Sequence, residues 1–119
     1  MSRPILARID LSALKNNLRV VRRLTSSRVM AVIKANAYGH GLSRVAAALS
    51  DAEGLALLDV RDAMQLRDEG CRQTILLLEG YFAREELPLI AEYDLACVIH
   101  STQQLAWLDA YPRKNALSV

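Results

Sequence analysis

Short apolar runs alternate with amphipathic segments along most of the chain. Each apolar run suits a strand of a parallel sheet, because such strands are covered by side chains on both faces. In the segments between them, apolar residues recur every three or four positions, which is the period of a helix packed on one face. The predicted strands are 29–33, 54–58, 74–78 and 95–99, with the beginning of a fifth at 117–119.

Residues that cap helices mark several of the predicted helix ends. Asp10 or Ser12 precedes the first amphipathic segment, and Asp59 precedes a segment that Gly70 ends. Ser101 and Gln104 have the spacing of a capping box. Pro88 is compatible with a helix only in or near its first turn. The predicted helices are 11–24, 42–49, 60–69, 84–93 and 102–110.

The order of these elements predicts an α/β fold. One helix precedes four strand-helix units, which follow each other at intervals of about 20 to 25 residues, and this order implies parallel strands with right-handed crossovers. The loops are short and no glycine-rich dinucleotide fingerprint is present, so a (β/α)8 barrel is favoured over an open doubly wound sheet. A TIM-type barrel needs roughly 250 residues. The 119 residues therefore predict the first half of an incomplete barrel.

Composition and charge narrow the possible functions. Hydrophobic residues make up 52% of the chain, which is enough for a core and excludes general disorder. The formal net charge is +2, from interleaved Lys, Arg, Asp and Glu, so neither nucleic acid nor an anionic membrane is an expected partner. No apolar stretch is long enough for a membrane span, and Asp10 interrupts any signal peptide, which predicts a cytoplasmic protein. Cys71 and Cys97 are too far apart for a metal or redox motif, so reduced, inert thiols and no metal site are expected.

The segment 33–41, with the sequence IKANAYGHG, carries the most specific chemistry. Lys34 ends a predicted strand, at the edge where parallel α/β folds place catalytic groups. Apolar neighbours favour a neutral amine, which attacks aldehydes, so we hypothesise a Schiff-base lysine. The alternative is a lysine that ends its strand by extending to water. Gly39 and Gly41 allow a tight turn, and Tyr38 adds a hydroxyl, which together suit an anion such as a phosphate.

The string AVIKANAYGHG, from Ala31 to Gly41, resembles the pyridoxal-phosphate attachment signature of alanine racemases. Three further strings agree with that family: ARIDLSALKNNL with its opening strand and helix, GLALLDVRDAMQLRDEG with its second barrel unit, and ILLLEG with its third strand. The resemblance covers essentially the whole chain and is closest to proteobacterial enzymes, including the catabolic form.

The resemblance implies a fold-type III enzyme that interconverts L-alanine and D-alanine, either for peptidoglycan or in alanine catabolism. Its N-terminal barrel binds pyridoxal 5'-phosphate, and a β-rich C-terminal domain follows it in a head-to-tail homodimer. Residues 1–119 would form the first half of the barrel domain, and the C-terminal domain is expected outside them. They would also lack the acid that faces Lys34, which in the family is a tyrosine of the partner subunit. Residues 1–119 alone are therefore expected to racemise little.

Carried over by residue, the resemblance assigns three positions. Lys34 would hold the cofactor and act as the base on the D-alanine side. Tyr38 would contact the cofactor phosphate, and Leu78, at the end of the third predicted strand, would line the cofactor cleft.

The other candidates have structural interpretations. Asn36 is expected to hydrogen-bond within its loop and His40 to shape the turn between the two glycines, while His100 is expected to be a neutral, hydrogen-bonded histidine. Four of the five aromatic residues outside the motif are interpreted as structural: Tyr81, Tyr93, Trp107 and Tyr111.

Two alternative functions stay open at this point. Amino-acid decarboxylases and D-threonine aldolases share the fold type and cofactor, but they do not normally share the KANAYGHG run. A small pyridoxal-phosphate homeostasis protein, from a different functional class, carries a different lysine motif and ranks last.

Overall fold

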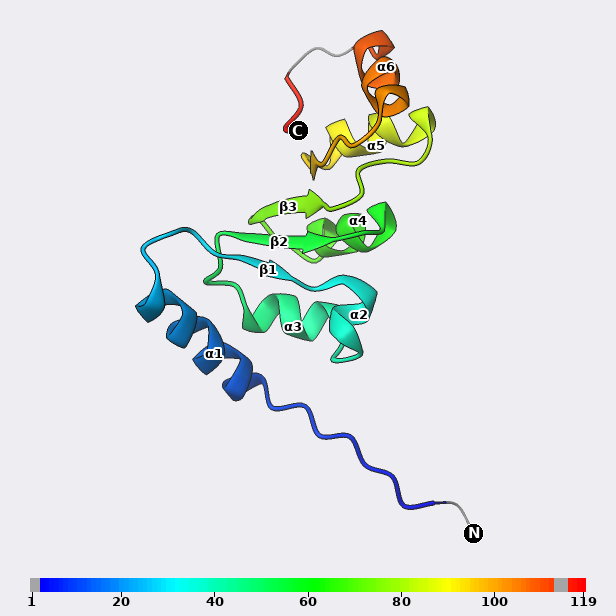
Figure 1. Cartoon of the computed structure of the whole chain (residues 1–119). Coiled ribbons are helices and arrows are strands. Elements are labelled where there is room, and N and C mark those ends of the chain that lie inside the picture. Colours follow the sequence, from blue (N-terminus) through cyan, green and yellow to red (C-terminus); the bar gives the residue numbers. More distant parts are fainter. Residues whose placement is uncertain (1–2, 113–115) are drawn as a thin grey trace.

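The computed structural model describes residues 3–112 and 116–119, and its centre is a four-stranded parallel sheet (Figure 1). Neighbouring strands follow the order of the sequence, without the reversal that marks the switch point of a doubly wound sheet. This order favours a barrel over an open sheet. The strands are β1 (Met30–Val32), β2 (Gly54–Leu57), β3 (Thr74–Leu77) and β4 (Ala96–Cys97).

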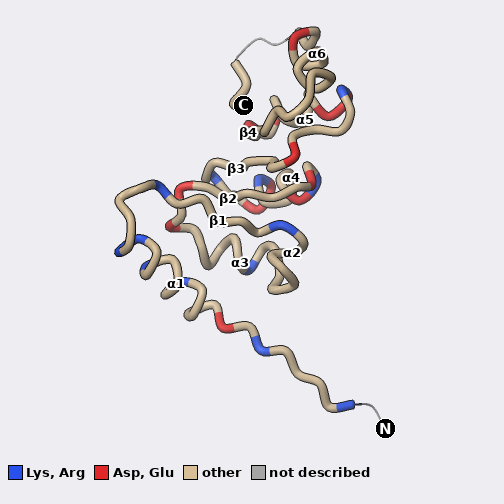
Figure 2. The backbone as a smooth tube through the Cα atoms, in the orientation of Figure 1, with Lys and Arg blue, Asp and Glu red and all other residues tan. Residues whose placement is uncertain are grey.

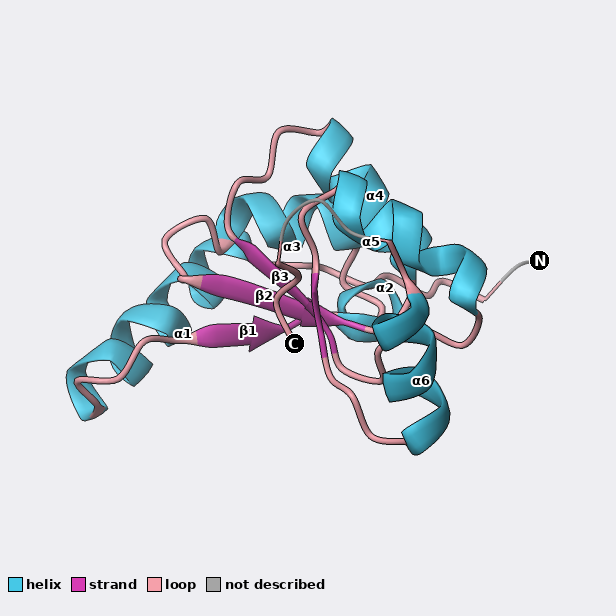
Figure 3. Ribbon diagram, turned by 90° about the horizontal axis from the view of Figure 1, so that it is seen from above, coloured by secondary structure: helices cyan, strands magenta, loops and turns pink. Residues whose placement is uncertain are grey.

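Helices follow each strand and cover one face of the sheet, where α3, α4 and α5 lie side by side in Figure 3. The prediction of an α/β fold with parallel strands is confirmed. The helical elements are α1 (Leu11–Leu24), α2 (Lys34–Tyr38), α3 (Leu42–Ala48), α4 (Val60–Asp68), the 3-10 helix η1 (Arg84–Glu86), α5 (Leu87–Glu92) and α6 (Thr102–Ala110).

The predicted caps begin the helices that they precede. Asp10, rather than Ser12, caps α1, because its Oδ1 accepts from the amide of Ala13 at 3.1 Å. Asp59 Oδ1 accepts from the Arg61 amide at 2.8 Å at the start of α4. Ser101 Oγ accepts from the Gln104 amide at 3.1 Å at the start of α6. Each bond satisfies an amide that the first turn of a helix leaves without a backbone acceptor.

The core lies between the sheet and the helices. Side chains alternate between the two faces of a strand, and Leu55, Leu57, Ile75 and Leu77 are fully buried, with 0% exposure. Burying a leucine or isoleucine side chain contributes about 1.5 to 3 kcal/mol. On β1, by contrast, Met30 and Val32 expose 41% and 43% of their surface. This strand forms one edge of the sheet.

The structure departs from the sequence predictions in three places. The segment predicted as one helix over 84–93 divides into η1 and α5, and Pro88 lies in the first turn of α5, where its ring is tolerated. The predicted strand at 117–119 is wrong: within the described residues one backbone bond, from the Cys97 amide to Ser118 O at 3.0 Å, ties it to β4, too little for a ladder. The third departure is α2, which the sequence analysis treats as a loop.

Candidate active site

Lys34 stands at the carboxyl end of β1, directly after the buried residue Ile33. The Ile33 amide donates to Ala56 O at 2.8 Å, so pairing with β2 continues up to the residue before the lysine. The Lys34 side chain is half-buried, and it takes part in none of the ion pairs of residues 3–112 and 116–119. Its amine is therefore not neutralised by a carboxylate within the described chain.

The segment α2 is a left-handed turn. Ala35, Asn36, Ala37 and Tyr38 all have φ between 52° and 54°, and Gly39 follows with a φ of 86°. Left-handed helical backbone costs about 1 to 2 kcal/mol per residue for L-amino acids, and apart from glycine only Asn and Asp adopt it readily. Strain of this kind persists only where the surroundings fix it, and it concentrates at functional sites.

Backbone hydrogen bonds close this left-handed turn. The Ala37 amide donates to Ile33 O at 3.0 Å, and the Gly39 amide lies 3.1 Å from both Ala35 O and Asn36 O. Gly41, whose φ is 97°, donates to Asn36 O at 3.0 Å. The turn thus links the end of β1 to the start of α3 with little free backbone between them.

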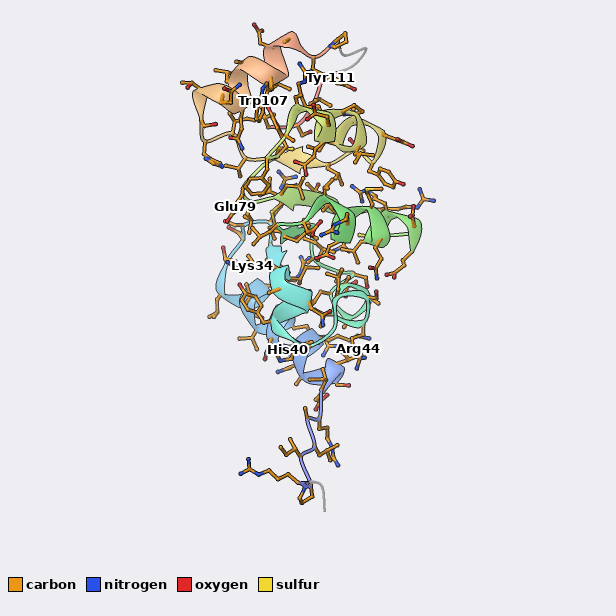
Figure 4. The ribbon with its side chains drawn as sticks, turned by 90° about the vertical axis from the view of Figure 1, so that its right-hand side faces the viewer. Lys34, His40, Arg44, Glu79, Trp107 and Tyr111 are labelled. Atoms are coloured by element: carbon orange, nitrogen blue, oxygen red, sulfur yellow. The ribbon has the colours of Figure 1, made fainter. Side chains whose placement is uncertain are left out.

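Two side chains of the motif complete the turn, as the sequence analysis expects. Asn36 Oδ1 accepts from the amide of Leu42, the first residue of α3, at 2.9 Å. His40 Nδ1 lies 2.9 Å from Ala37 O, and because a carbonyl only accepts, this nitrogen carries the proton. Figure 4 shows Lys34 and His40 at the two ends of this segment.

The predicted site residues share the same edge of the sheet. Tyr38 is the last residue of the left-handed turn and exposes 58% of its surface. Leu78 lies one residue past the end of β3, where its amide still donates to Leu57 O at 2.9 Å. In the register of the sheet, Val32, Ala56 and Leu76 are level, and Lys34 and Leu78 each lie two residues further on. Both residues thus lie just beyond the carboxyl ends of their strands.

Gln104 organises the same edge near β3 and β4, and the sequence analysis gives it only a capping role. Its side chain is 4% exposed; the Nε2 group donates to Glu79 O at 3.0 Å and to Tyr81 O at 3.1 Å, and Oε1 accepts from the His100 amide at 2.8 Å. These two bonds use both protons of the Gln104 amide group. The ring Nε2 of His100 lies 3.0 Å from Glu79 O, and it must donate there because a carbonyl oxygen only accepts. A glutamine at the third position of a predicted helix was the available signal.

The aromatic and thiol side chains near this edge are structural, as expected. Tyr81 is buried, and its hydroxyl donates to Gln104 O at 2.5 Å while its ring packs against Trp107 at a centroid distance of 6.4 Å. Burial raises the pKa of the Cys97 thiol to about 11, which makes it a poor nucleophile at neutral pH. Cys71 is half-buried, and both cysteines are free.

Charge gives this edge no strong field of one sign. Residues of both signs lie on α4, although α1 carries only basic ones (Figure 2). Among residues 3–112 and 116–119, no three His, Cys, Asp or Glu side chains lie close enough to hold a metal ion. The same residues contain no helix that is both long and apolar enough to cross a membrane.

Comparison with known proteins identifies the family. A family model described as the N-terminal domain of alanine racemase matches residues 9–119. The chain belongs to the alanine racemase family. Alanine racemases of Nitrosospira multiformis and Pseudomonas putida, the latter described as catabolic, are 57% and 48% identical over 100% and 98% of the chain. The resemblance carried by AVIKANAYGHG is confirmed.

Solved alanine racemases share the fold. The biosynthetic enzyme of Pseudomonas aeruginosa superposes with a TM-score of 0.86 and 37% identity over 92% of this chain, which covers 31% of that enzyme. The enzyme of Bacillus anthracis, solved with bound L-Ala-P, superposes with a TM-score of 0.75 and 30% identity over 85% of this chain and 26% of its own. The four parallel strands are thus part of the TIM-barrel domain of this family, which uses pyridoxal phosphate.

The chain spans about one third of the length of these relatives. It covers 34% of the Nitrosospira multiformis racemase and 33% of the Pseudomonas putida racemase. About two thirds of the length of these relatives therefore has no counterpart in the 119 residues.

Proposed function

We propose that the protein, in its full length, interconverts L-alanine and D-alanine with pyridoxal 5'-phosphate attached to Lys34. One observation carries the proposal: the lysine of the AVIKANAYGHG string stands at the carboxyl edge of a parallel sheet, where α/β folds bind their ligands. Membership of the alanine racemase family supports the reaction. The decarboxylase, aldolase and homeostasis-protein alternatives have no such support.

The residues at this edge fit the cofactor. An aldehyde requires an amine that is not engaged in an ion pair, and within the described residues Lys34 satisfies that requirement. A phosphate requires donors near the amine, and Tyr38 presents an exposed hydroxyl from the same left-handed turn. Leu78, level with Lys34 across β2, supplies an apolar wall for the ring.

Lys34 and Tyr38 have different tasks in the proposed reaction. The Lys34 amine holds the cofactor before alanine enters, and it then takes or returns the proton of the α-carbon on the D-alanine side. The Tyr38 hydroxyl donates to a phosphate oxygen and keeps the cofactor in place while that attachment is exchanged. Pyridoxal phosphate, when bound, withdraws electrons from the α-carbon and so makes its proton removable.

A racemase also needs an acid on the opposite side of the α-carbon, because inversion requires loss of a proton from one side and its return to the other. We propose that a tyrosine of a second copy supplies it in a homodimer, as the family resemblance implies. The proposed substrate is free alanine, and the proposed location is the cytoplasm.

Formation of D-alanine from L-alanine by the purified full-length protein tests this function. Lys34→Ala is expected to lower the rate at least about 10³-fold, because it removes both the attachment point and a general base, which alone is typically worth about 10²- to 10⁴-fold. Lys15→Ala, on the exposed face of α1, is the matched control and is expected to leave the rate unchanged. Turnover of lysine, ornithine or threonine with no action on L-alanine would contradict the proposal.

A further inference from the structure

The left-handed turn separates the two residues proposed to hold the cofactor. Lys34 precedes the left-handed residues and Tyr38 is the last of them, so the backbone of residues 35–37 sets the relative position of their Cα atoms. All three have φ near 53°, in a region that alanine avoids and asparagine tolerates. The most stable isolated conformation of this segment is therefore a different one, and something must hold the turn.

Asn36 makes the side-chain contact that ties this turn to a regular element. Its Oδ1 accepts from the Leu42 amide at 2.9 Å, and its backbone oxygen accepts from Gly41 at 3.0 Å, so both ends of the residue face the start of α3. Leu42 is buried, with 6% exposure, and anchors that helix in the core. Through Asn36, a strained turn is fastened to a rigid helix.

His40 adds a second contact on the opposite side of Gly39. Its Nδ1 donates to Ala37 O at 2.9 Å, across the middle of the turn. Both Asn36 and His40 are exposed residues, so neither fills space in the core. Replacing either residue removes a hydrogen bond and leaves core packing intact. An effect on cofactor binding would therefore come from the shape of the turn and not from loss of the fold.

We infer that Asn36 and His40 are positioning residues, which hold the left-handed turn and thereby set Lys34 and Tyr38 at the distance and angle that one bound pyridoxal phosphate requires. The inference rests on the proposed function, because it assigns Lys34 and Tyr38 to the cofactor. Neither side chain needs to touch the cofactor or the substrate. Their effect reaches the cofactor through backbone geometry.

The test measures affinity for pyridoxal phosphate by absorbance titration of the full-length apoprotein, together with the spectrum of the bound cofactor. Asn36→Gly is the informative variant, because glycine adopts a φ near 54° without strain and lacks only the acceptor. The affinity is expected to fall about tenfold, which corresponds to one lost hydrogen bond. For His40→Ala, which leaves the tie to α3 intact, about threefold is expected.

Two further variants separate positioning from general destabilisation. Asn36→Asp keeps the acceptor and tolerates positive φ, and about 1 M salt screens its added charge, so affinity and spectrum should return to near the wild-type values. Ser43→Ala is the control: it removes two side-chain hydrogen bonds in the first turn of α3, from Ser43 Oγ to Glu69 at 2.8 Å and from Gln65 Nε2 to Ser43 Oγ at 3.0 Å, but lies outside the left-handed turn. It should leave affinity and spectrum unchanged.

The outcomes distinguish this inference from the function on which it rests. Wild-type affinity and spectrum in Asn36→Gly would overturn the positioning role, as would an equal loss in Ser43→Ala. Should Lys34→Ala bind and retain the cofactor after borohydride reduction as well as the wild type does, the proposed function itself fails, whatever the Asn36 variants show. Loss of trapping in Lys34→Ala beside unchanged Asn36→Gly would refute the positioning role alone.

Discussion

The loops at the amino ends of the strands and the connection that follows β1 at the carboxyl end are built in different ways. At the amino ends of the strands, long side chains donate to the carbonyls of the connecting loops. Arg67 donates to the backbone oxygens of Cys71, Gln73, Tyr93 and Asp94 at 2.7 to 2.9 Å. At the carboxyl ends, the connection after β1 is a strained turn with the exposed residue Tyr38. One end is fastened for stability, and the other accepts strain to place chemical groups.

A second set of hydrogen bonds, made by Glu53, Arg22 and Gln73, also holds the loops at the amino ends of the strands; we call it the amino-end clamp. Glu53 accepts from the Val29 amide at 2.7 Å and pairs with Arg22 at 2.8 Å, and Arg22 also donates to Asp51 O. Gln73 donates to Leu49 O at 3.0 Å and to Ala52 O at 2.6 Å. These bonds tie the segments before β1, β2 and β3 together. Substitutions at the amino end should therefore change stability alone, whereas those at the carboxyl end should also change cofactor binding and rate.

The largest stability effect is expected for Arg67→Met at the amino end. Methionine keeps most of the length of the side chain but leaves the carbonyl oxygens in this partly buried region without their donor, which should lower the free energy of unfolding by about 2 to 4 kcal/mol. Urea unfolding of the full-length protein measures it. Below the melting temperature, affinity for pyridoxal phosphate should match the wild type; a lost affinity would break the division between the two ends.

A smaller effect is expected for Gly80→Ala, at the carboxyl end after β3. Gly80 has a φ of 70°, and a Cβ there would lie 2.3 Å from Val98 O and 3.0 Å from Gln104 Nε2. Strain and displacement of the Gln104 contacts should together cost about 1 to 3 kcal/mol.

Gly70→Ala is the control at the amino end, because its φ is 94° but nothing lies within 4 Å of its Cβ. The expected loss of stability there is about 1 kcal/mol, because only the positive φ disfavours alanine. Equal losses in the two variants, measured by thermal unfolding, would show that the loops after β3 and β4 do not pack as closely as described.

The smallest effect concerns the pH dependence of stability. The Val29 amide, with help from Arg22, lowers the pKa of Glu53 below its ordinary value of 4.5. A carboxylate whose pKa is lower in the folded state stabilises the fold above pH 4.5, and this contribution disappears as the pH falls through the folded-state pKa.

Glu53→Gln should therefore flatten the loss of stability below pH 4.5, whereas Glu92→Gln, on an exposed position of α5, serves as a charge control. Melting temperatures measured from about pH 3 to about pH 7 show the difference, because this interval includes the ordinary pKa of a carboxyl group, about 4. Identical plots of melting temperature against pH for the wild type and Glu53→Gln would show that Glu53 does not stabilise the amino end of the sheet.

Much of the fold was predictable because its signals are local. The apolar runs place every strand end within two residues of the observed one, and Asp59 and Gly70 mark the limits of α4 through side-chain capping and positive φ. The sequential order of the strands also follows from the repeated strand-helix units, because right-handed crossovers with short loops place consecutive strands side by side.

The left-handed turn and the hydrogen bonds of Arg67 and Gln104 to neighbouring loops could not be predicted from the sequence. Ala35 and Ala37 normally favour right-handed helix, and nothing in their own side chains signals the positive φ that they adopt here. The partners of Arg67 and Gln104 lie on other connections, so their roles depend on tertiary structure. Lys34, Tyr38 and Leu78 were identified through a motif and a family resemblance, and their proposed roles at the cofactor remain predictions.

The most direct test of the carboxyl-end site is reduction of the full-length holoprotein with borohydride, followed by mass spectrometry of its peptides. The mass of the reduced cofactor should be found on Lys34 and be lost in Lys34→Ala, while Asn36→Gly should show weaker labelling of the same residue at limiting cofactor. A label on any other lysine, or no label on a protein saturated with pyridoxal phosphate, would contradict the assignment of Lys34.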